Sequence, residues 1–244
     1  MRIYKDCYEL MSEIFRDVLE MGIKVHPHSM QNKIVKDDTN FATKEIVAYD
    51  YCLLSRDKAE NLFLFDTNAL PWCKAEHAER VNPLTDNPGE AWKLRRDTWA
   101  QFLNGDGEFD YCYSTRFNRP EAIDLVIEEL VRNPDSRQAI LSIWDRQIDI
   151  HNLGGKRRIP CSIYYQILIR EGRVHLIYHQ RSADVVTHFG NDIWLAWQMM
   201  EYFTHVLQGR GLEVVTGYLY HNIGSLHVYN KDIPTLEVCV KSMR

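Results

Sequence analysis

Apolar residues recur at helical spacing near the start of the chain. Over residues 7–19 they fall three or four positions apart, which predicts an amphipathic helix with one side in the core. Over 22–65 short apolar runs alternate with polar breaks, a pattern typical of strands and loops. Helical spacing returns over 71–81, and the segments 82–83 and 87–89, which contain Pro or Gly, then indicate turns.

The rest of the chain alternates between the same two patterns. Further helices are predicted over residues 91–103, 120–131 and 193–207. Strands are predicted over residues 139–144, 162–170, 173–180 and 214–220. No repeat or convincing linker divides the sequence, so we expect one α+β domain that spans residues 1–244.

Composition narrows the class of protein. Of 244 residues 45% are hydrophobic and 26% charged, and the net charge of -5 argues against binding to a nucleic-acid polymer, which requires a basic surface. The N-terminus lacks the apolar segment of a secretory signal, and no apolar run is long enough to span a membrane. The six cysteines lack CxxC spacing, which indicates reduced thiols in the cytoplasm, without a disulfide framework or a zinc site, and no motif indicates another metal.

Two short segments combine residue types that suit catalysis. Arg158-Ile159-Pro160-Cys161-Ser162 places a cysteine at the start of a predicted strand, behind cationic residues that favour the thiolate. A cysteine taken alone is more often a small buried hydrophobic residue. Gln180-Arg181-Ser182-Ala183-Asp184-Val185 offers a guanidinium, a hydroxyl and a carboxylate near a strand end, either for a phosphate or for a surface salt bridge.

Two further segments carry polar groups at predicted turns and edges. Asn133-Pro134-Asp135-Ser136-Arg137 joins a helix to a strand, and its arginine is either functional or simply exposed. In Gly224-Ser225-Leu226-His227-Val228-Tyr229 the imidazole and the phenol share one face if the segment is extended. That pair suits a sugar hydroxyl, or it is a polar pair at a sheet edge.

The order and spacing of these four segments resemble the thymidylate synthase family, over roughly residues 99–231. Within that family the sequence is similar to the phage deoxycytidylate hydroxymethylase branch, through segments 133–137, 184–186, 191–192 and 224–229. The resemblance implies a thymidylate synthase-like fold, in which helices flank a mixed or antiparallel sheet. It also implies a homodimer that forms through the sheet.

The resemblance assigns roles to the residues around the cysteine. Cys161 matches the thiol that attacks C6 of a pyrimidine nucleotide. Arg181 and Ser182 match the residues that hold its phosphate, and Arg137 matches an arginine that the partner subunit donates to the same phosphate.

Other matches concern the sugar, the co-substrate and water. His227 and Tyr229 match the groups that bind the 3′-hydroxyl of the sugar. Asp184 matches a carboxylate on the folate side, and Tyr113 matches a tyrosine that positions water near the base. The implied co-substrate is 5,10-methylenetetrahydrofolate, with no metal.

One position is expected to read the base. Thymidylate synthases keep an asparagine there for uracil, and an ungapped alignment from Arg181 places Asp192 at that position. A carboxylate accepts from N4 of cytosine and, when protonated, can give a proton to N3. Aspartate also suits a helix N-cap before Ile193. A one-residue gap would place Asn191 there instead and restore uracil.

The resemblance also implies a catalytic glutamate, and the sequence departs from the family pattern at three further positions. Glu76 is the better match for the family glutamate on an upstream helix, and Glu79 is the alternative, although both also suit a solvated helix face. Gln138 stands where a second phosphate arginine is usual. Ser162 stands where a histidine often follows the nucleophile, and Lys33 is a weak substitute for a missing N-terminal phosphate arginine.

The resemblance therefore implies a C5 one-carbon transferase of nucleotide biosynthesis, in the host cytoplasm if phage-encoded, that prefers dCMP to dUMP. Only 15 residues follow Tyr229, whereas the synthases have a longer tail that closes over the folate and excludes water. A site that admits water favours hydroxymethylation by water over methylation by hydride. Ser182 favours a deoxynucleotide. The alternatives are a thymidylate synthase or dCMP methyltransferase and, from another class, a catalytically silent nucleotide-binding homologue.

Overall fold

The computed structural model describes residues 1–66, 68–118 and 121–243, and within them a mixed seven-stranded sheet lies at the centre of the molecule. Its strands are β1 (Arg2–Tyr4), β2 (Ile23–Val25), β5 (Thr43–Leu53), β6 (Ile140–Ser142), β7 (Ser162–Arg170), β8 (Arg173–Asp184) and β9 (Val215–Tyr229). They lie in the order β1-β5-β9-β8-β7-β6, with β2 also paired to β5. A separate hairpin pairs β3 (Ser29–Met30) with β4 (Lys33–Ile34).

Neighbouring strands of the sheet pair in both directions. β9 is antiparallel to β5 and parallel to β8, whereas β7 is antiparallel to both β8 and β6. The start of β7, the end of β8 and the end of β9 therefore meet at the same end of the sheet. The register Ser162↔Gln180 between β7 and β8, and Ser182↔Ser225 between β8 and β9, places these three strand ends side by side.

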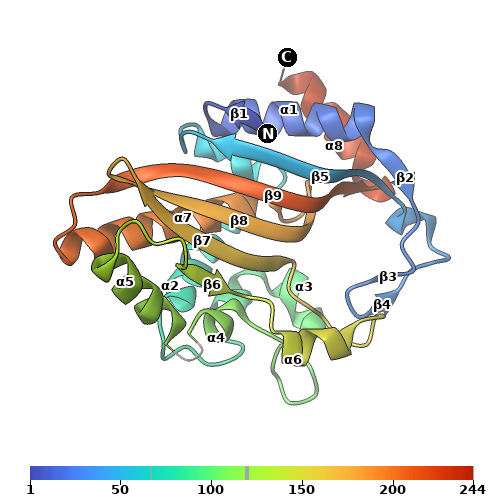
Figure 1. Cartoon of the computed structure of the whole chain (residues 1–244). Coiled ribbons are helices and arrows are strands. Elements are labelled where there is room, and N and C mark those ends of the chain that lie inside the picture. Colours follow the sequence, from blue (N-terminus) through green and yellow to red (C-terminus); the bar gives the residue numbers. More distant parts are fainter. Residues whose placement is uncertain (67, 119–120, 244) are drawn as a thin grey trace.

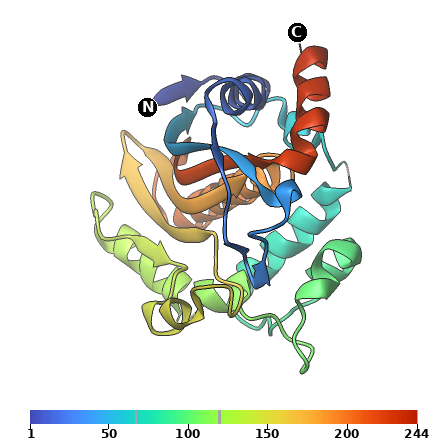
Figure 2. The ribbon, with the colours of Figure 1, turned by 90° about the vertical axis from the view of Figure 1, so that its right-hand side faces the viewer.

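The helices complete the core. The longer ones are α1 (Cys7–Met21), α2 (Ala69–Arg80), α5 (Ala122–Arg132), α7 (Phe189–Gly209) and α8 (Ile233–Ser242), and the shorter ones are α3 (Arg96–Trp99), α4 (Tyr113–Phe117) and α6 (Arg146–Asp149). Figure 1 shows α7 running along the sheet and α1 beside α8 beyond β5. Figures 1 and 2 place both termini at that same end of the molecule. None of the described helices is long and apolar enough to cross a membrane.

The two faces of the sheet differ in burial. Along β8 the side chains of Val174, Leu176 and Tyr178 are buried in the core that α7 completes. The alternate residues Ile177 and His179 remain partly exposed on the opposite face. Because successive residues of a strand point to opposite sides, one face of the sheet is covered by the chain and the other stays accessible.

The periodic segments were predicted well, and the polar strand ends were not. β7 covers the predicted residues 162–170, and α2 begins and ends within two residues of the predicted 71–81. The strand predicted over 214–220 instead continues to Tyr229, because Asn222 and Ser225 pair with β5 and β8 in the middle of the sheet. Residue 120, where a helix was predicted to begin, lies outside the described residues.

The single helix predicted over residues 91–103 was wrong. The segment forms a 3-10 turn (Ala91–Arg95), the short helix α3 and a second 3-10 turn (Ala100–Phe102). Arg95 interrupts it, with φ -131° and ψ 50°. This break lets the Arg95 guanidinium pair with Asp66 at 2.7 Å and lie over the ring of Trp72 at 5.2 Å. Tertiary contacts thus override helical spacing here.

Candidate active site

Cys161 immediately precedes β7, where three separate segments of the chain meet. Its carbonyl accepts a hydrogen bond from the backbone N–H of Arg181 at 2.8 Å, which ties it to β8. Its Sγ lies 3.7 Å from Nη2 of Arg181 and 3.6 Å from Nε2 of Gln31. Two N–H donors therefore converge on the sulfur, one from a strand and one from a distant hairpin.

Opposing influences set the acidity of this thiol. Burial raises the pKa of Cys161 above its usual value, and the charge of Asp192 acts in the same direction. The positive charges of Arg181 and Arg158, and the hydrogen bond from Gln31, lower that pKa. The net direction is upward, so the resting group at neutral pH is mostly the thiol. Its thiolate depends on the surrounding donors and cations for stabilisation.

Arg181 is held rigidly beside the sulfur. Its Nε donates to the Pro160 carbonyl at 2.8 Å, and its Nη2 donates to the Ile159 carbonyl at 3.2 Å. Ser182 follows on β8 and lies opposite Ser225 of β9. A fixed guanidinium and a hydroxyl at one strand end suit an oxyanion such as a phosphate.

Arg137 is not brought into this cluster within one chain. It lies exposed between α5 and β6, and Gln166 of β7 donates to its backbone carbonyl at 2.9 Å. Among the described residues its side chain has no hydrogen-bond partner or ion-pair partner around Cys161. Gln138 follows it and is likewise exposed.

Asp192 lies in the first turn of α7 and faces the sheet. Its Oδ2 accepts a hydrogen bond from Nε2 of Gln180 at 2.7 Å. Burial raises the pKa of Asp192 to about 6, while the Gln180 hydrogen bond and the charge of Arg80 oppose that rise. The neighbouring Asn191 is turned toward α2, where its Oδ1 lies 3.6 Å from Sγ of Cys73.

A buried relay behind Asp192 fixes the direction of these hydrogen bonds. Because a carboxylate only accepts, Gln180 must present its NH₂ to Asp192 and its Oε1 to Nε2 of His221, at 2.9 Å. His221 is fully buried, and burial lowers its pKa to about 3, so the ring is neutral. Its Nδ1 then accepts from the Tyr51 hydroxyl at 2.8 Å. The relay holds the carboxyl group of Asp192 in one orientation.

The two candidate glutamates of α2 have different surroundings. Glu76 accepts from Nε of the buried Arg80 at 2.9 Å, and the Arg80 guanidinium lies 4.1 Å from the ring centroid of Tyr113. Glu79 instead accepts from the backbone N–H groups of Glu90 and Ala91, at 2.6 and 2.7 Å. Glu79 therefore anchors a loop, whereas Glu76 points with Arg80 toward the polar cluster.

Tyr113 belongs to a chain of hydroxyl groups. Its hydroxyl lies 3.2 Å from Oγ of Ser162, which lies 2.5 Å from the Tyr178 hydroxyl. The Tyr178 ring stacks on His221 with a centroid distance of 4.3 Å. Hydroxyls that both donate and accept can hold water and pass protons next to Cys161.

Asp184, His227 and Tyr229 meet at the ends of β8 and β9. Asp184 lies opposite His227 in the strand register, and its Oδ1 accepts from the backbone N–H of Val186 at 3.1 Å. The rings of His227 and Tyr229 pack edge to face at 5.2 Å. Burial raises the pKa of Tyr229, and the charges of Asp184 and Cys161 raise it further, so these side chains share one environment.

Arg158 enters an aromatic cluster three residues before Cys161. Its guanidinium carbon lies 4.0 Å from the ring centroid of Phe102 and 5.3 Å from that of Trp99. Trp99 lies 5.5 Å from the ring of His188. Among the described residues, Nε of Arg158 and Nε1 of Trp99 are buried and donate to no acceptor. A flat ligand that carries several hydrogen-bond acceptors fits these surroundings.

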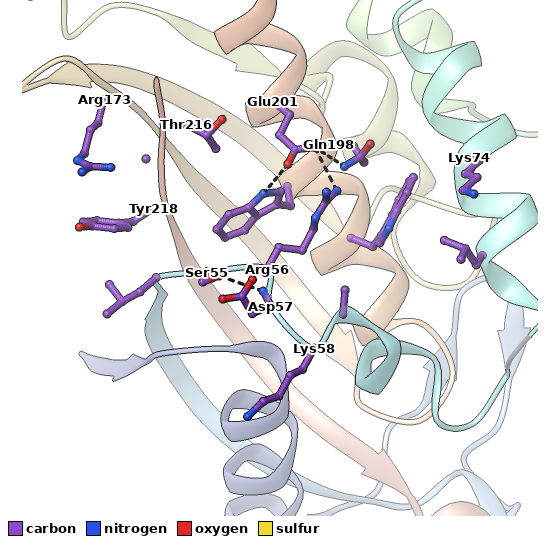
Figure 3. A pocket seen from close by; sticks show the side chains of 16 residues that line it. Ser55, Arg56, Asp57, Lys58, Lys74, Arg173, Gln198, Glu201, Thr216 and Tyr218 are labelled. Atoms are coloured by element: carbon purple, nitrogen blue, oxygen red, sulfur yellow. Dashed lines mark hydrogen bonds and ion pairs between the residues drawn. The ribbon is translucent and has the colours of Figure 1, made fainter. Parts of the chain in front are cut away.

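A cleft of about 800 Å³ lies away from Cys161, between the segment after β5, α7 and the start of β9 (Figure 3). Glu201 at its centre accepts from Arg56 and from Nε1 of Trp197, both at 3.1 Å. Lys58 at its rim pairs with Asp6 at 2.9 Å. These polar groups satisfy one another, and none of the site residues predicted from the sequence lines this cleft.

Sequence reasoning missed several residues of the cluster. Gln31, Gln180 and Arg80 each contact a predicted site residue, and His221 contacts Gln180. Gln180 stands next to Arg181 in a segment already singled out, and Arg80 stands four residues after Glu76 on the predicted helix, so the sequence pattern could have revealed both. Gln31 and His221 reach the site only through tertiary folding. Among the described residues no group of His, Cys, Asp and Glu side chains could hold a metal ion.

Comparison with known proteins identifies the family. The thymidylate synthase family model matches residues 67–243, which is more than half of the chain. The chain belongs to the thymidylate synthase family. The family consists of folate-dependent transferases that add a one-carbon unit to C5 of pyrimidine nucleoside monophosphates, with methylenetetrahydrofolate as donor. The resemblance inferred from the four sequence segments is thereby confirmed.

Relatives of two kinds share this similarity. Deoxycytidylate 5-hydroxymethyltransferase of Enterobacteria phage T4 is 28% identical over 82% of this chain and 81% of that protein. Thymidylate synthase 1 of Bacillus spizizenii is 24% identical over 93% of this chain and 81% of that protein. Thermostable thymidylate synthase A from Bacillus subtilis superimposes with a TM-score of 0.73 at 18% identity, covering 96% of this chain and 84% of that one. This match confirms the predicted thymidylate synthase fold.

Proposed function

We propose that this family member is a deoxycytidylate 5-hydroxymethylase, which uses 5,10-methylenetetrahydrofolate and water to place a hydroxymethyl group on C5 of dCMP. The observation that carries the proposal is Asp192, a carboxyl group with a raised pKa that Gln180 fixes near Cys161. The similarity to the phage T4 deoxycytidylate 5-hydroxymethyltransferase supports the same base.

The chemistry of Asp192 matches cytosine. Neutral cytosine presents an acceptor at N3 beside a donor at N4, so a protonated carboxyl group pairs with both positions: O–H to N3 and C=O from N4–H. Uracil presents a donor at N3 and an acceptor at O4. An ionised carboxylate leaves O4 without a donor, and a protonated carboxyl group, which could pair with both positions, cannot pass its proton to N3 because N3 already carries one. Since burial raises the pKa of Asp192 to about 6, its neutral form is accessible near physiological pH.

The reaction begins at Cys161. Its thiolate attacks C6, the S–C6 bond forms, and the electron pair of the C5–C6 double bond moves through C4 toward N3, which takes the proton of Asp192. C5 becomes an enamine carbon, able to accept the one-carbon unit that the folate supplies. When C5 loses its proton and tetrahydrofolate departs, C5 is left with an exocyclic methylene, and water that Glu76 and Tyr113 order adds to it. Expulsion of the Cys161 thiolate and return of the N3 proton to Asp192 then restore the aromatic ring.

Nucleotide binding draws on the strand ends and on a second copy of the chain. Arg181 and Ser182 bind the phosphate, and His227 and Tyr229 bind the 3′-hydroxyl of deoxyribose. Arg137 reaches the same phosphate from the partner subunit of a homodimer. Its exposure and the accessible face of the sheet support this arrangement, with residues 1–244 acting as one catalytic domain.

The folate binds on the side of Asp184. The aromatic cluster around Trp99, with its buried unpaired donors, supports a flat heterocyclic co-substrate there. Methylation of dUMP or dCMP, with the folate also supplying hydride, is the second candidate, favoured by the similarity to thymidylate synthase 1 of Bacillus spizizenii.

Release of tritium from C5 tests whether this chain performs the C5 chemistry at all. With methylenetetrahydrofolate present, we expect [5-³H]dCMP to release tritium into water much faster than [5-³H]dUMP, because substitution at C5 removes that hydrogen. Absence of release from both nucleotides would identify a catalytically silent homologue.

The pH dependence of kcat/KM for dCMP should report the proton shared by Cys161 and Asp192. The reactive form needs the Cys161 thiolate and protonated Asp192 together. Between about pH 6 and the thiol pKa, the fraction of thiolate rises with pH while the fraction of protonated Asp192 falls equally. Their product, and with it kcat/KM, therefore stays level over this range. Below about pH 6 it should fall as the thiolate is lost without gain of neutral Asp192. In Asp192→Asn the level region disappears, because only the thiolate fraction then varies with pH, and kcat/KM for its preferred nucleotide should rise with pH without a break until the thiol ionises. A level region that still begins near pH 6 in the variant would contradict this assignment.

A further inference from the structure

The β3–β4 hairpin brings a side-chain amide from the N-terminal part of the chain to Cys161. Gln31 lies in the turn between the two strands, and its Nε2 lies 3.6 Å from the Cys161 sulfur. Its Oε1 accepts from the backbone N–H of Ile159 at 3.3 Å. In Figure 1 the hairpin lies apart from the main sheet, beside the segment that leads into β7. One carboxamide thus bridges the nucleophile and the backbone two residues before it.

The contact with Ile159 fixes which end of the amide faces the sulfur. A backbone N–H is a donor, so it must meet the carbonyl oxygen of Gln31, and the NH₂ group is left for Cys161. An N–H donor binds an anionic acceptor more strongly than a neutral one. Gln31 therefore favours the thiolate over the thiol, in the same sense as the Arg181 guanidinium on the other side.

The hairpin is fitted closely to the segment that precedes the nucleophile. Gln31 has φ 54°, in the left-handed region that a residue with a side chain rarely adopts. Gly155 has φ 79°, and a Cβ there would meet Cδ1 of Ile34 at 3.2 Å and Cβ of Ser29 at 3.3 Å. A costly backbone conformation persists where the surrounding structure fixes it, often at a functional site.

We propose that Gln31 is a positioning residue, which holds the Cys161 sulfur in place and stabilises its thiolate together with Arg181. The inference rests on the proposed role of Cys161 as nucleophile. It adds that part of the nucleophile's activation comes from a hairpin outside the four segments of the family pattern. For the sulfur to bond C6, the Gln31 amide must remain at its side and leave the approach to the base open.

Alkylation of Cys161 across pH tests this proposal without any nucleotide. The rate with iodoacetamide follows the thiolate, and mass spectrometry of the Cys161 peptide separates it from the other cysteines. For Gln31→Met, of similar length but without a donor, we expect the thiol pKa to rise by about one unit, which slows alkylation at pH 7 about tenfold. For Gln31→Arg we expect the opposite, a lower thiol pKa and faster alkylation, because a cation replaces the neutral amide.

Asn32→Ala is the matched control. Asn32 is the next residue of the same turn and is exposed, so its variant should leave the thiol pKa unchanged. Thiol pKa values of the Met and Arg variants that both equal that of the unsubstituted protein, or that shift in the same direction, would overturn the proposal. A purely structural role would give that second result. Since alkylation uses no substrate, failure of tritium release from dCMP would count against the proposed function and leave this inference standing.

Discussion

Replacing Cys161 with alanine is expected to reduce tritium release from C5 of dCMP by at least roughly 10⁴-fold, as removal of a covalent nucleophile does in other enzymes. The physical reason is that no other described group can add to C6 from the same position. Its sulfur alone lies between the Arg181 and Gln31 donors. Binding of dCMP should persist, because the groups proposed to hold phosphate and sugar remain, and isothermal titration can verify this.

Cys239→Ala provides the matched control for that experiment. Cys239 is half-buried in α8, where its Sγ lies 3.9 Å from Sδ of Met243. Its replacement should leave tritium release within about twofold of the starting rate, as is usual for a site remote from the chemistry. If Cys161→Ala released tritium as fast as Cys239→Ala does, Cys161 could not be the nucleophile.

Asp192→Asn is expected to reverse the preference between the two bases. The amide oxygen can accept from N3–H of uracil and from Gln180, while its NH₂ donates to O4; cytosine would instead meet an unsatisfied N3. Unpaired buried polar groups discriminate strongly, so the ratio of kcat/KM for dCMP to that for dUMP should fall by roughly 10²–10⁴-fold. Parallel measurements of kcat/KM for both nucleotides give this ratio directly.

Asn191→Ser distinguishes this assignment from the alternative alignment. Asn191 contacts Cys73 of α2 and not Gln180, so its loss should affect stability while leaving the dCMP-to-dUMP ratio unchanged. If the dCMP-to-dUMP ratio changed in Asn191→Ser and stayed the same in Asp192→Asn, Asn191 and not Asp192 would be the residue that reads the base.

The sequence alone predicted the helices and strands whose apolar residues recur at regular spacing. It also predicted the candidate site residues that stand together in short motifs. β7 and α1 were found because their apolar spacing reports burial directly. Cys161, Arg181 and Tyr229 stand in short segments with characteristic spacing, so the family was recognisable without a structure. The end of β9 was missed because its polar residues resemble a break in the chain, although they lie between two other strands.

The rest of the site could not be predicted because it depends on contacts between distant segments. His221 gave no local signal, yet it connects Tyr51 of β5 to Gln180 and thereby orients Asp192. The choice between Glu76 and Glu79 was open in the sequence, where both fit a helix face. In the fold the backbone of Glu90 and Ala91 engages Glu79, and only Glu76 stays with Arg80 near Tyr113.

The identity of the product tests the central proposal most directly. The protein would be given dCMP, dUMP and CMP side by side with methylenetetrahydrofolate, and products would be identified by mass spectrometry while dihydrofolate absorbance is followed. We expect 5-hydroxymethyl-dCMP from dCMP, little product from dUMP or CMP, and no rise in dihydrofolate absorbance, because water and not hydride completes the reaction. A methylated nucleotide formed together with dihydrofolate would contradict the proposal.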